Sequence, residues 1–449
     1  MMTFKKGLVR ARGHIAFIIG LLIAVSIAWF EEQQMPRPVK AWIENFSQTL
    51  GIDPDEVYLR KTGHGLSSQE KVWAKIAWKY FENNYVEETG LVNSVDGYNS
   101  TTLWDSGSYV MGVIAARKLR IISEEELTQR LGKLLDSLAR IPLIDDKLPN
   151  KAYNTKNLHM TNYNNEDTPL GIGWSTIDIA RFGVPMQIIV WNHPQLAPKV
   201  KAVLSRWDFS YAAKNGVLQT ASRKEDGSLK FNQEGRFGYE QYAGKSLAFM
   251  GLDVSRSVRY DVRVGIAPVS GQKIAYDTRL PRNYSGTHNA VLSEPYILEA
   301  VEYGLNQITK PLAHAVLQAQ VNRFNETGIL TAVSEDNIDR EPYFVYYSVL
   351  NDMKPWAAFS PDGEDASEHR CLSLKAAMGW GVVFDGDYPD FLLENIGDMF
   401  DAKRGWYSGR YEADGKLNKA ITANTNGLVL ELLAYKRFGP LLSHAIAGK

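Results

Sequence analysis

Most of this 449-residue chain carries the apolar spacing of 3.6 residues that is typical of amphipathic helices. In the stretch SSQEKVWAKIAWKYFENNY, Ser67 and Glu70 form a capping box and apolar residues recur on one face. A second capping box pairs Ser123 with Glu126. The spacing predicts eleven helices, near residues 67–85, 104–118, 123–140, 174–192, 195–208, 239–251, 293–304, 309–325, 367–382, 388–400 and 423–437.

Long connections rich in Gly, Asn, Asp and Tyr separate several of these helices, at residues 141–173, 209–238, 252–292 and 326–366. Loops of this length are usually functional, so we expect them to form a cleft on one face. Alternation around residues 257–278 predicts a few short strands. The pattern favours an all-α fold, an (α/α)6 toroid, over a helical solenoid, because no fixed-period repeat is present.

Composition excludes some classes of function and favours others. Fifty basic and fifty-one acidic residues give a net charge of -1, so no global field favours nucleic acid. Cys371 is the only cysteine, and no calcium-loop motif or phosphate-binding glycine loop occurs. We therefore predict no metal and no cofactor. The 11 Trp and 22 Tyr residues could supply flat surfaces on which sugar rings lie.

The N-terminal region has the pattern of an export segment. An apolar run extends from Ile15 to Phe30 after four basic residues, which are Lys5, Lys6, Arg10 and Arg12. This asymmetry predicts that the rest of the chain crosses the inner membrane into the periplasm. Residues 1–34 form either a signal peptide cut after Ala28 or an uncleaved anchor; the bulky Trp29 that follows favours the anchor. Residues 35–66 read as a lead-in or stalk, and 67–449 as the catalytic-like domain.

Two acidic segments are the strongest candidates for catalysis. In GRFGYEQYAGKSLAFMGLD, Glu240 lies between Tyr239 and Tyr242, and contact with aromatic faces would raise its pKa as a general acid requires. In GILTAVSEDNIDREPYFVYY, Glu335 and Asp336 are adjacent, and one of them could act as a base. Alternatively, Glu240 caps a helix and the second segment is a solvated turn.

Other residues are candidates for binding substrate, each with a structural alternative. Asp105 opens a helix, and Glu166 with Asp167 precede the helix that contains Asp178, so these carboxylates could bind sugar hydroxyls. Arg340 could contact an anionic sugar or pair with Glu341. Aromatic candidates, which could equally belong to the core or a cleft wall, are Trp104, Trp174, Tyr239, Tyr242, Trp356, Trp406 and Tyr411.

Several motifs together resemble a bacterial envelope family known as domain of unknown function 3131, among them TTLWDSGSYVMGVIAARKLRIIS, GWSTIDIARFGVPMQII, FGYEQYAGKSLAFMGLD and ITANTNGLVLELLAYKR. The chain is more remotely similar to the glycoamylase-like and β-1,2-glucanase families, which are α/α-toroid glycoside hydrolases. That resemblance implies an acid role for Glu240 and a base role for Asp336. Compared with the LTASD-type segment of those families, this chain has extra residues between LTA and the acid, so Glu335 is an alternative to Asp336 as the base. The resemblance also implies that the STID stretch ending at Asp178 lines the cleft.

These observations predict an inverting glycoside hydrolase that acts on a bacterial glucan or exopolysaccharide. A non-catalytic binding or assembly protein that serves polysaccharide export or synthesis machinery is the alternative. Transglycosylation would differ only in the acceptor. A polysaccharide lyase would need a Tyr or His base beside Arg or Asn, and one segment contains candidates: Arg279, Arg282, Tyr284, His288 and Asn289.

Overall fold

The computed structural model describes residues 46–281 and 287–442. The chain divides into two compact units, Met1–Asp53 and Pro54–Lys449, and the second carries the predicted helices. The expected anchor or signal peptide at residues 15–30 lies outside the described residues. Within the described ranges, no helix combines the length and apolar character needed to cross a membrane.

A helix forms in each of the eleven predicted places, but some are shorter than expected. Residues 367–373 contain a 3-10 turn and a short strand, so the helix predicted at 367–382 begins only at Leu374, and the helix predicted at 388–400 ends at Glu394. Both predicted N-caps form, since Ser67 accepts from the Glu70 amide and Ser123 from the Glu126 amide, each at 3.1 Å. The first is a full capping box, because the Ser67 amide donates back to Glu70 at 2.8 Å, whereas the Glu126 carboxylate pairs with Arg130 instead. The helices are α4 (Ser68–Asn83), α5 (Leu103–Lys118), α6 (Glu124–Leu138), α7 (Thr176–Asn192), α8 (Ala197–Leu204), α9 (Tyr239–Phe249), α10 (Glu294–Leu298), α11 (Thr309–Thr327), α12 (Leu374–Val383), α13 (Asp387–Glu394) and α14 (Ala423–Phe438). A π-helical turn, Glu299–Tyr303, continues α10.

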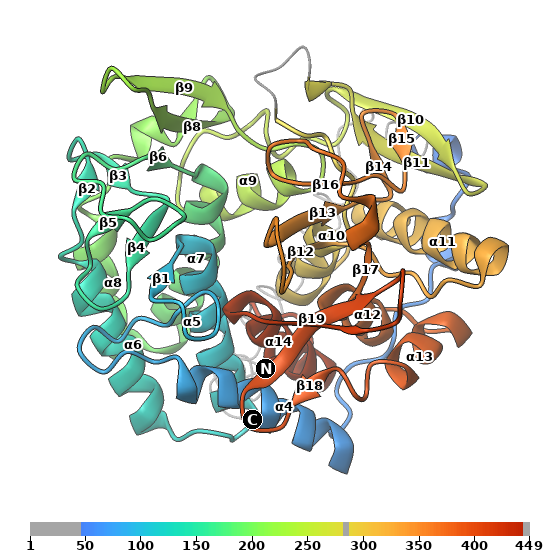
Figure 1. Cartoon of the computed structure of the whole chain (residues 1–449), viewed down its shortest axis with the longest axis horizontal. Coiled ribbons are helices and arrows are strands. Elements are labelled where there is room, and N and C mark those ends of the chain that lie inside the picture. The colour runs from blue at the N-terminus through green and yellow to red at the C-terminus, as the bar shows by residue number, and fades with distance from the viewer. Residues whose placement is uncertain (1–45, 282–286, 443–449) are drawn as a thin grey trace, which may run out of the picture. The chain divides into compact units, whose positions relative to one another are not determined.

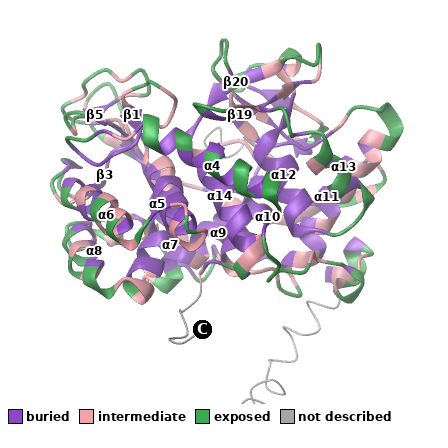
Figure 2. Ribbon diagram, turned by 90° about the horizontal axis from the view of Figure 1, so that it is seen from below, coloured by how far each residue is buried: buried purple, intermediate pink, exposed green. Residues whose placement is uncertain are grey.

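Six of these helices form a ring. Helices α5, α7, α9, α10, α12 and α14 pack against one another in this order, and α14 packs back against α5 (Figure 1). The ring helices are largely buried, and every residue of α12 is buried. Outside them, α4 packs on α14, α6 on α5, α8 on α7, α11 on α10 and α13 on α12. Figure 2 shows the exposed residues concentrated on the outer helices and loops.

The long connections contain far more strand than the predicted few short strands, so the all-α expectation is wrong in this respect. Within residues 46–281 and 287–442, twenty strands form small antiparallel sheets. The first three sheets are β1 (Ser100–Thr101) with β4 (Ala152–Asn154) and β5 (Met160–Thr161); β6 (Gly173–Trp174) with β7 (Ala213–Lys214), β8 (Val217–Arg223) and β9 (Leu229–Gln233); and β2 (Leu143–Ile144) with β3 (Leu148–Pro149). Most are too short to show a period of two residues.

The remaining sheets lie in the second half of the chain. They are β10 (Val264–Val269) with β11 (Gln272–Asp277); β12 (Glu335–Asn337) with β13 (Phe344–Tyr347) and β16 (Ala358–Phe359); β14 (Leu350–Asn351) with β15 (Lys354–Pro355); and β17 (Cys371–Ser373) with β18 (Phe400–Asp401), β19 (Gly405–Tyr411) and β20 (Leu417–Ile421). The hairpin of β10 and β11 confirms the strands expected near residues 257–278.

Residues 54–66, the part of the expected lead-in that belongs to the second unit, are hydrogen-bonded to the helix ring. The Arg60 amide donates to the Val383 carbonyl at the end of α12 (2.9 Å), and the Gly63 amide donates to the Lys436 carbonyl in the last turn of α14 (3.0 Å). Residues 54–66 are therefore bonded to the carboxyl ends of two ring helices.

A fully buried ionic cluster joins four ring elements. Arg181 on α7 pairs with Glu302 on the π-helical turn and with Glu431 on α14, the latter at 2.6 Å. The Tyr242 hydroxyl on α9 donates to Glu302 at 2.8 Å. Burial raises the pKa of both glutamates, and Arg181 opposes that shift. Tyr242, which was predicted to bind substrate, belongs to this core cluster.

We expect Arg181→Met to lower the free energy of unfolding by about 3–5 kcal/mol at pH 8, because it leaves two carboxyl groups buried without their cation. Without Arg181 these carboxyl groups protonate more readily, and a protonated carboxyl no longer needs a cation. The loss in free energy of unfolding should therefore be smaller at pH 5 than at pH 8. Chemical denaturation at both pH values measures this difference.

The matched control is Arg117→Met, which removes an exposed pair with Glu124 and should cost less than about 1 kcal/mol. Equal losses in the two variants would contradict a structural role for the buried cluster.

Candidate active site

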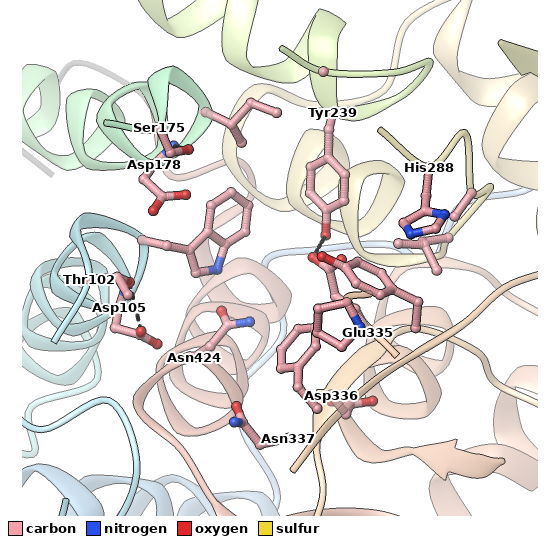
Figure 3. A pocket seen from close by; sticks show the side chains of 18 of the residues that line it. Thr102, Asp105, Ser175, Asp178, Tyr239, His288, Glu335, Asp336, Asn337 and Asn424 are labelled. Atoms are coloured by element: carbon pink, nitrogen blue, oxygen red, sulfur yellow. Dashed lines mark hydrogen bonds between the residues drawn. The ribbon is translucent and has the colours of Figure 1, made fainter. Parts of the chain in front are cut away.

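A cavity of about 620 Å³ opens where the amino ends of the ring helices converge. Helices α5, α7, α9, α12 and α14 each place residues of their first turn in its lining, and Leu292 lies just before α10. The long connections supply the rest of the wall. Side chains that Figure 3 labels include Thr102, Asp105, Ser175, Asp178, Tyr239, His288, Glu335, Asp336, Asn337 and Asn424.

One wall presents carboxyl groups at helix starts. Thr102 caps α5, and its hydroxyl donates to Asp105 at 2.8 Å. Ser175 caps α7, and its hydroxyl accepts from the Asp178 amide at 3.1 Å. Burial raises the pKa of Asp105 and that of Asp178, the latter to about 8. Asp178 is therefore largely protonated at neutral pH.

Glu234 completes this wall. Its carboxylate accepts hydrogen bonds from the amides of Thr176 (2.5 Å) and Ile177 (3.1 Å) at the start of α7. Two amide donors and the positive end of the helix favour its ionised form, although burial raises its pKa. The charge of Glu234 adds to the effect of burial on the pKa of Asp178.

The facing wall carries the second acidic pair, on β12. Figure 3 shows Glu335 beside Tyr239, whose hydroxyl donates to it at 2.6 Å. Burial and the charge of Glu294 raise the pKa of Glu335. Asp336, only 8% exposed, has a pKa raised by burial to about 7, and the Lys375 ammonium at 3.7 Å favours its ionised form.

The predicted general acid does not lie in this lining. Glu240 is 4% exposed; it forms an ion pair with Arg279 and accepts from the Ser257 hydroxyl at 2.9 Å. Its neighbour Tyr239 faces the cavity instead, because successive helix residues point about 100° apart. The burial expected of Glu240 is present, but its carboxyl is directed toward structural partners, so the acid role does not fit.

Of the four predicted tryptophan platforms, Trp104 alone lines the cavity. Trp174 and Trp406 are fully buried, and their indole N–H groups donate to backbone carbonyls at 3.2 and 3.1 Å. Trp356 lies outside the lining, with the Arg323 guanidinium over its ring at 5.2 Å. Trp174 and Trp406 therefore belong to the core rather than to a sugar-binding surface. Full burial of such large rings contributes strongly to the stability of the fold.

Four more predicted binding residues also lie outside the cavity lining. Glu166 and Asp167 bond to side chains of their own loop. Arg340 stacks over Tyr411 at 3.9 Å, and the Tyr411 hydroxyl donates to Asp339 at 2.7 Å. For Arg340 the structure shows contacts within the protein, mainly with Tyr411 and Asp339.

The lyase constellation is not assembled in the described residues. His288 lines the cavity, whereas Arg279 is occupied by buried carboxylates and Asn289 bonds to backbone groups. Arg282 and Tyr284 lie outside the described residues. In the described part of the chain, no group of three His, Cys, Asp or Glu side chains is arranged to hold a metal ion.

Sequence reasoning missed several lining residues. They come from loops, a short strand or a helix start with no local motif: Tyr163, Glu234, Tyr346 and Lys375. Asn424 also lines the cavity; it lies two residues after Thr422, which caps α14, and it donates to Glu294 at 2.8 Å.

The ring of helices with a cavity at their amino ends is the fold of α/α-toroid proteins. An endo-β-1,2-glucanase from Chitinophaga pinensis is similar with a TM-score of 0.56 at 14% identity, covering 84% of this chain and 94% of that one. An endo-β-1,2-glucanase from Talaromyces funiculosus has a TM-score of 0.57 at 10% identity and covers 84% of each chain. A proposed glucoamylase from Bacteroides caccae has a TM-score of 0.57 at 15% identity, covering 83% and 94%.

Residues 72–439 match the family described as "Protein of unknown function (DUF3131)". The chain belongs to this family, as its motifs indicated. No curated protein matches it significantly. At 10–15% identity, the likeness to the glucanases and the proposed glucoamylase shows the fold alone.

We expect Asp178→Asn to raise the melting temperature at pH 9 and to change it little at pH 4. Because the folded-state pKa of Asp178 is raised to about 8, its ionisation opposes folding progressively as the pH rises from about 4 to 8. Asparagine cannot ionise, so it removes this effect. Thermal unfolding across pH 4–9 measures the gain.

Asp226→Asn is the control, since hydrogen bonds from Ser228 lower the pKa of this exposed carboxyl. Its substitution should give no gain at high pH. A gain for Asp178→Asn that did not depend on pH would contradict the raised pKa.

Proposed function

We propose that this protein is a glycoside hydrolase that cleaves a bacterial glucan or a related exopolysaccharide with inversion at the anomeric carbon. The observation that carries the proposal is a cavity with carboxyl groups on two facing walls (Figure 3), lined also by the aromatic residues Trp104 and Tyr239, whose rings meet edge to face. Inverting hydrolysis needs one carboxyl group on each side of the scissile bond. The likeness of the fold to endo-β-1,2-glucanases supports this assignment.

Asp178 replaces Glu240 as the proposed general acid. Its raised pKa keeps it protonated at neutral pH, and it lies at the cavity wall. The proton passes to the glycosidic oxygen as the bond from that oxygen to the anomeric carbon breaks.

Glu335 is the proposed base, with the Tyr239 hydroxyl fixing its orientation. It accepts a proton from water, whose oxygen bonds to the anomeric carbon from the face opposite the leaving group. The products are two shorter glycans, and the new reducing end has the inverted configuration. Asp336, held near Lys375, contributes charge beside the base.

The charges of the lining favour a neutral glycan. Among the described lining residues five are acidic, and those that are ionised would repel an anionic sugar. The lysine and arginine residues there already have protein partners: Lys151 donates to Ser222, Arg236 to Gln233 and Lys375 to Glu294. Recognition of uronic acids by a lyase would need a cation available to the substrate.

We also propose that the enzyme works outside the inner membrane, anchored by residues 15–30 near a polysaccharide export or synthesis system. The apolar run and its preceding basic residues support this location. The helix ring and its outer helices support an (α/α)6 toroid as the detailed architecture.

The proposal predicts that Asp178→Asn and Glu335→Gln each lower the rate of glycan cleavage by at least about a hundredfold. Glu240→Gln should stay within about threefold of the unaltered protein, because Glu240 lies outside the lining. Reducing ends released from a panel of bacterial glucans measure cleavage, and ultraviolet absorbance reveals unsaturated lyase products.

New reducing ends without that absorbance, lost in both lining variants, would establish the hydrolase. Loss of activity in Glu240→Gln with the fold intact would restore Glu240 as the acid. Glycan binding without any product would instead favour the assembly protein. Nuclear magnetic resonance of the first product distinguishes inversion from retention.

The pH dependence of kcat/KM should be bell-shaped. Activity should fall as the pH rises through about 8, because Asp178 then loses the proton that it donates. On the acid side, kcat/KM should fall at pH values below the pKa of Glu335, because the base is then protonated. Burial and the charge of Glu294 raise this pKa well above the ordinary range of a glutamate. The residual activity of Asp178→Asn should not fall as the pH rises through this range. If it falls as before, the ionisation that limits activity at high pH belongs to another group.

A further inference from the structure

Two exposed tyrosines lie side by side at the edge of the cavity. Tyr163, on the connection between β5 and β6, lines the cavity yet is 63% exposed. Tyr98 is 38% exposed, and its hydroxyl donates to the Tyr163 carbonyl at 3.0 Å. Tyr98 does not line the cavity, so the pair extends from the cavity wall toward the outer surface. We refer to Tyr98 and Tyr163 as the tyrosine rim.

Tyr163 lines the same cavity as Asp178 and Glu234. The charges of these two carboxyl groups add to the desolvation that raises the pKa of the Tyr163 phenol. On the β12–β13 side, burial raises the pKa of Tyr346, and Glu335 and then Tyr163 add to this shift. Tyr163 is therefore close to both proposed catalytic walls, with most of its surface still open to solvent.

The loop that carries Tyr163 is held by its own hydrogen bonds. The Asn162 side-chain oxygen accepts from the amides of Asn164 and Glu166, each at 3.0 Å. The Asn162 side-chain amide donates to the Glu166 carboxylate at 2.7 Å. Glu166, predicted to bind sugar hydroxyls, instead supports this loop.

An exposed aromatic ring on a fixed loop is already ordered for binding. Tyrosine offers a flat apolar face with a polar tip and loses little conformational entropy on contact. Because the loop is hydrogen-bonded before a ligand arrives, the entropy cost of binding is reduced further. A sugar ring combines apolar C–H faces with hydroxyls, and this chemistry matches the tyrosine rim.

We propose that the tyrosine rim binds sugar units of the glycan that lie beyond the cavity, and so makes the protein prefer long chains. A chain leaving the cavity would pass Tyr163 first and Tyr98 next. A short oligosaccharide would fill the cavity without reaching Tyr98. The preference for cleaving long chains rests on the proposed hydrolase function, whereas binding by the rim does not.

The test compares kcat/KM of the full-length protein for a neutral glucan polymer and for the shortest oligosaccharide of the same linkage that is cleaved. Tyr98→Ala should lower the polymer-to-oligosaccharide ratio by about tenfold. Tyr163→Ala should lower kcat/KM for both substrates, because Tyr163 also lines the cavity, and should lower the ratio as well. Tyr98→Phe keeps the ring and should retain more of the ratio than Tyr98→Ala. Tyr58→Ala is the matched control, since Tyr58 is 72% exposed and lies outside the cavity lining.

Binding of the same polymer, measured by affinity electrophoresis, separates this inference from the hydrolase proposal. Cleavage with an unchanged ratio in both alanine variants would overturn the tyrosine rim and leave the hydrolase intact. If no glycan is cleaved, weaker polymer binding by both alanine variants, but not by Tyr58→Ala, would still support the rim. Equal binding by all variants would overturn it. Circular dichroism confirms that each variant is folded.

Discussion

The buried cluster around Arg181 joins the elements on which the cavity depends. Arg181 connects α7 to the π-helical turn after α10 and to α14, while Tyr242 adds α9. Burying these charges is costly, and they are tolerated only with their partners in place. The Arg181 guanidinium also lies 5.8 Å from the centre of the Trp104 ring, which lines the cavity. The ionic core and the aromatic surface of the site are thus in direct contact.

Convergence of helix starts determines the chemistry of the cavity. Unpaired amides and positive helix ends stabilise carboxylates such as Glu234, whereas burial and like charges favour protonation of Asp178. One region thereby holds acidic groups in different protonation states, as acid and base catalysis requires. The same arrangement lowers the stability of the folded protein as the pH rises, because ionising a buried carboxyl whose pKa is raised costs free energy.

The tyrosine rim and the facing walls show how the long connections become functional. Tyr163 and Glu335 line one cavity although they come from different connections, one between α6 and α7 and the other between α11 and α12. Each connection runs from an outer helix to a ring helix. Several aromatic residues that looked suitable for sugars, such as Trp174 and Trp406, are instead needed to fill the core. Residue type alone does not separate these uses, since a buried ring and an exposed ring have the same chemistry.

The sequence by itself located the eleven helices, because apolar spacing and capping residues act within a few turns of chain. It also identified the acidic segment at Glu335 and Asp336 and the stretch ending at Asp178. It did not show that the residues just before α12 pair as strand β17, because that strand depends on its distant partner β19. The tertiary structure alone decided which side chains share the cavity: Tyr239 faces it, but Glu240 lies one helix position away and pairs with Arg279. Glu234 and Tyr163 join the site through contacts between distant segments, and such contacts leave no local pattern in the sequence.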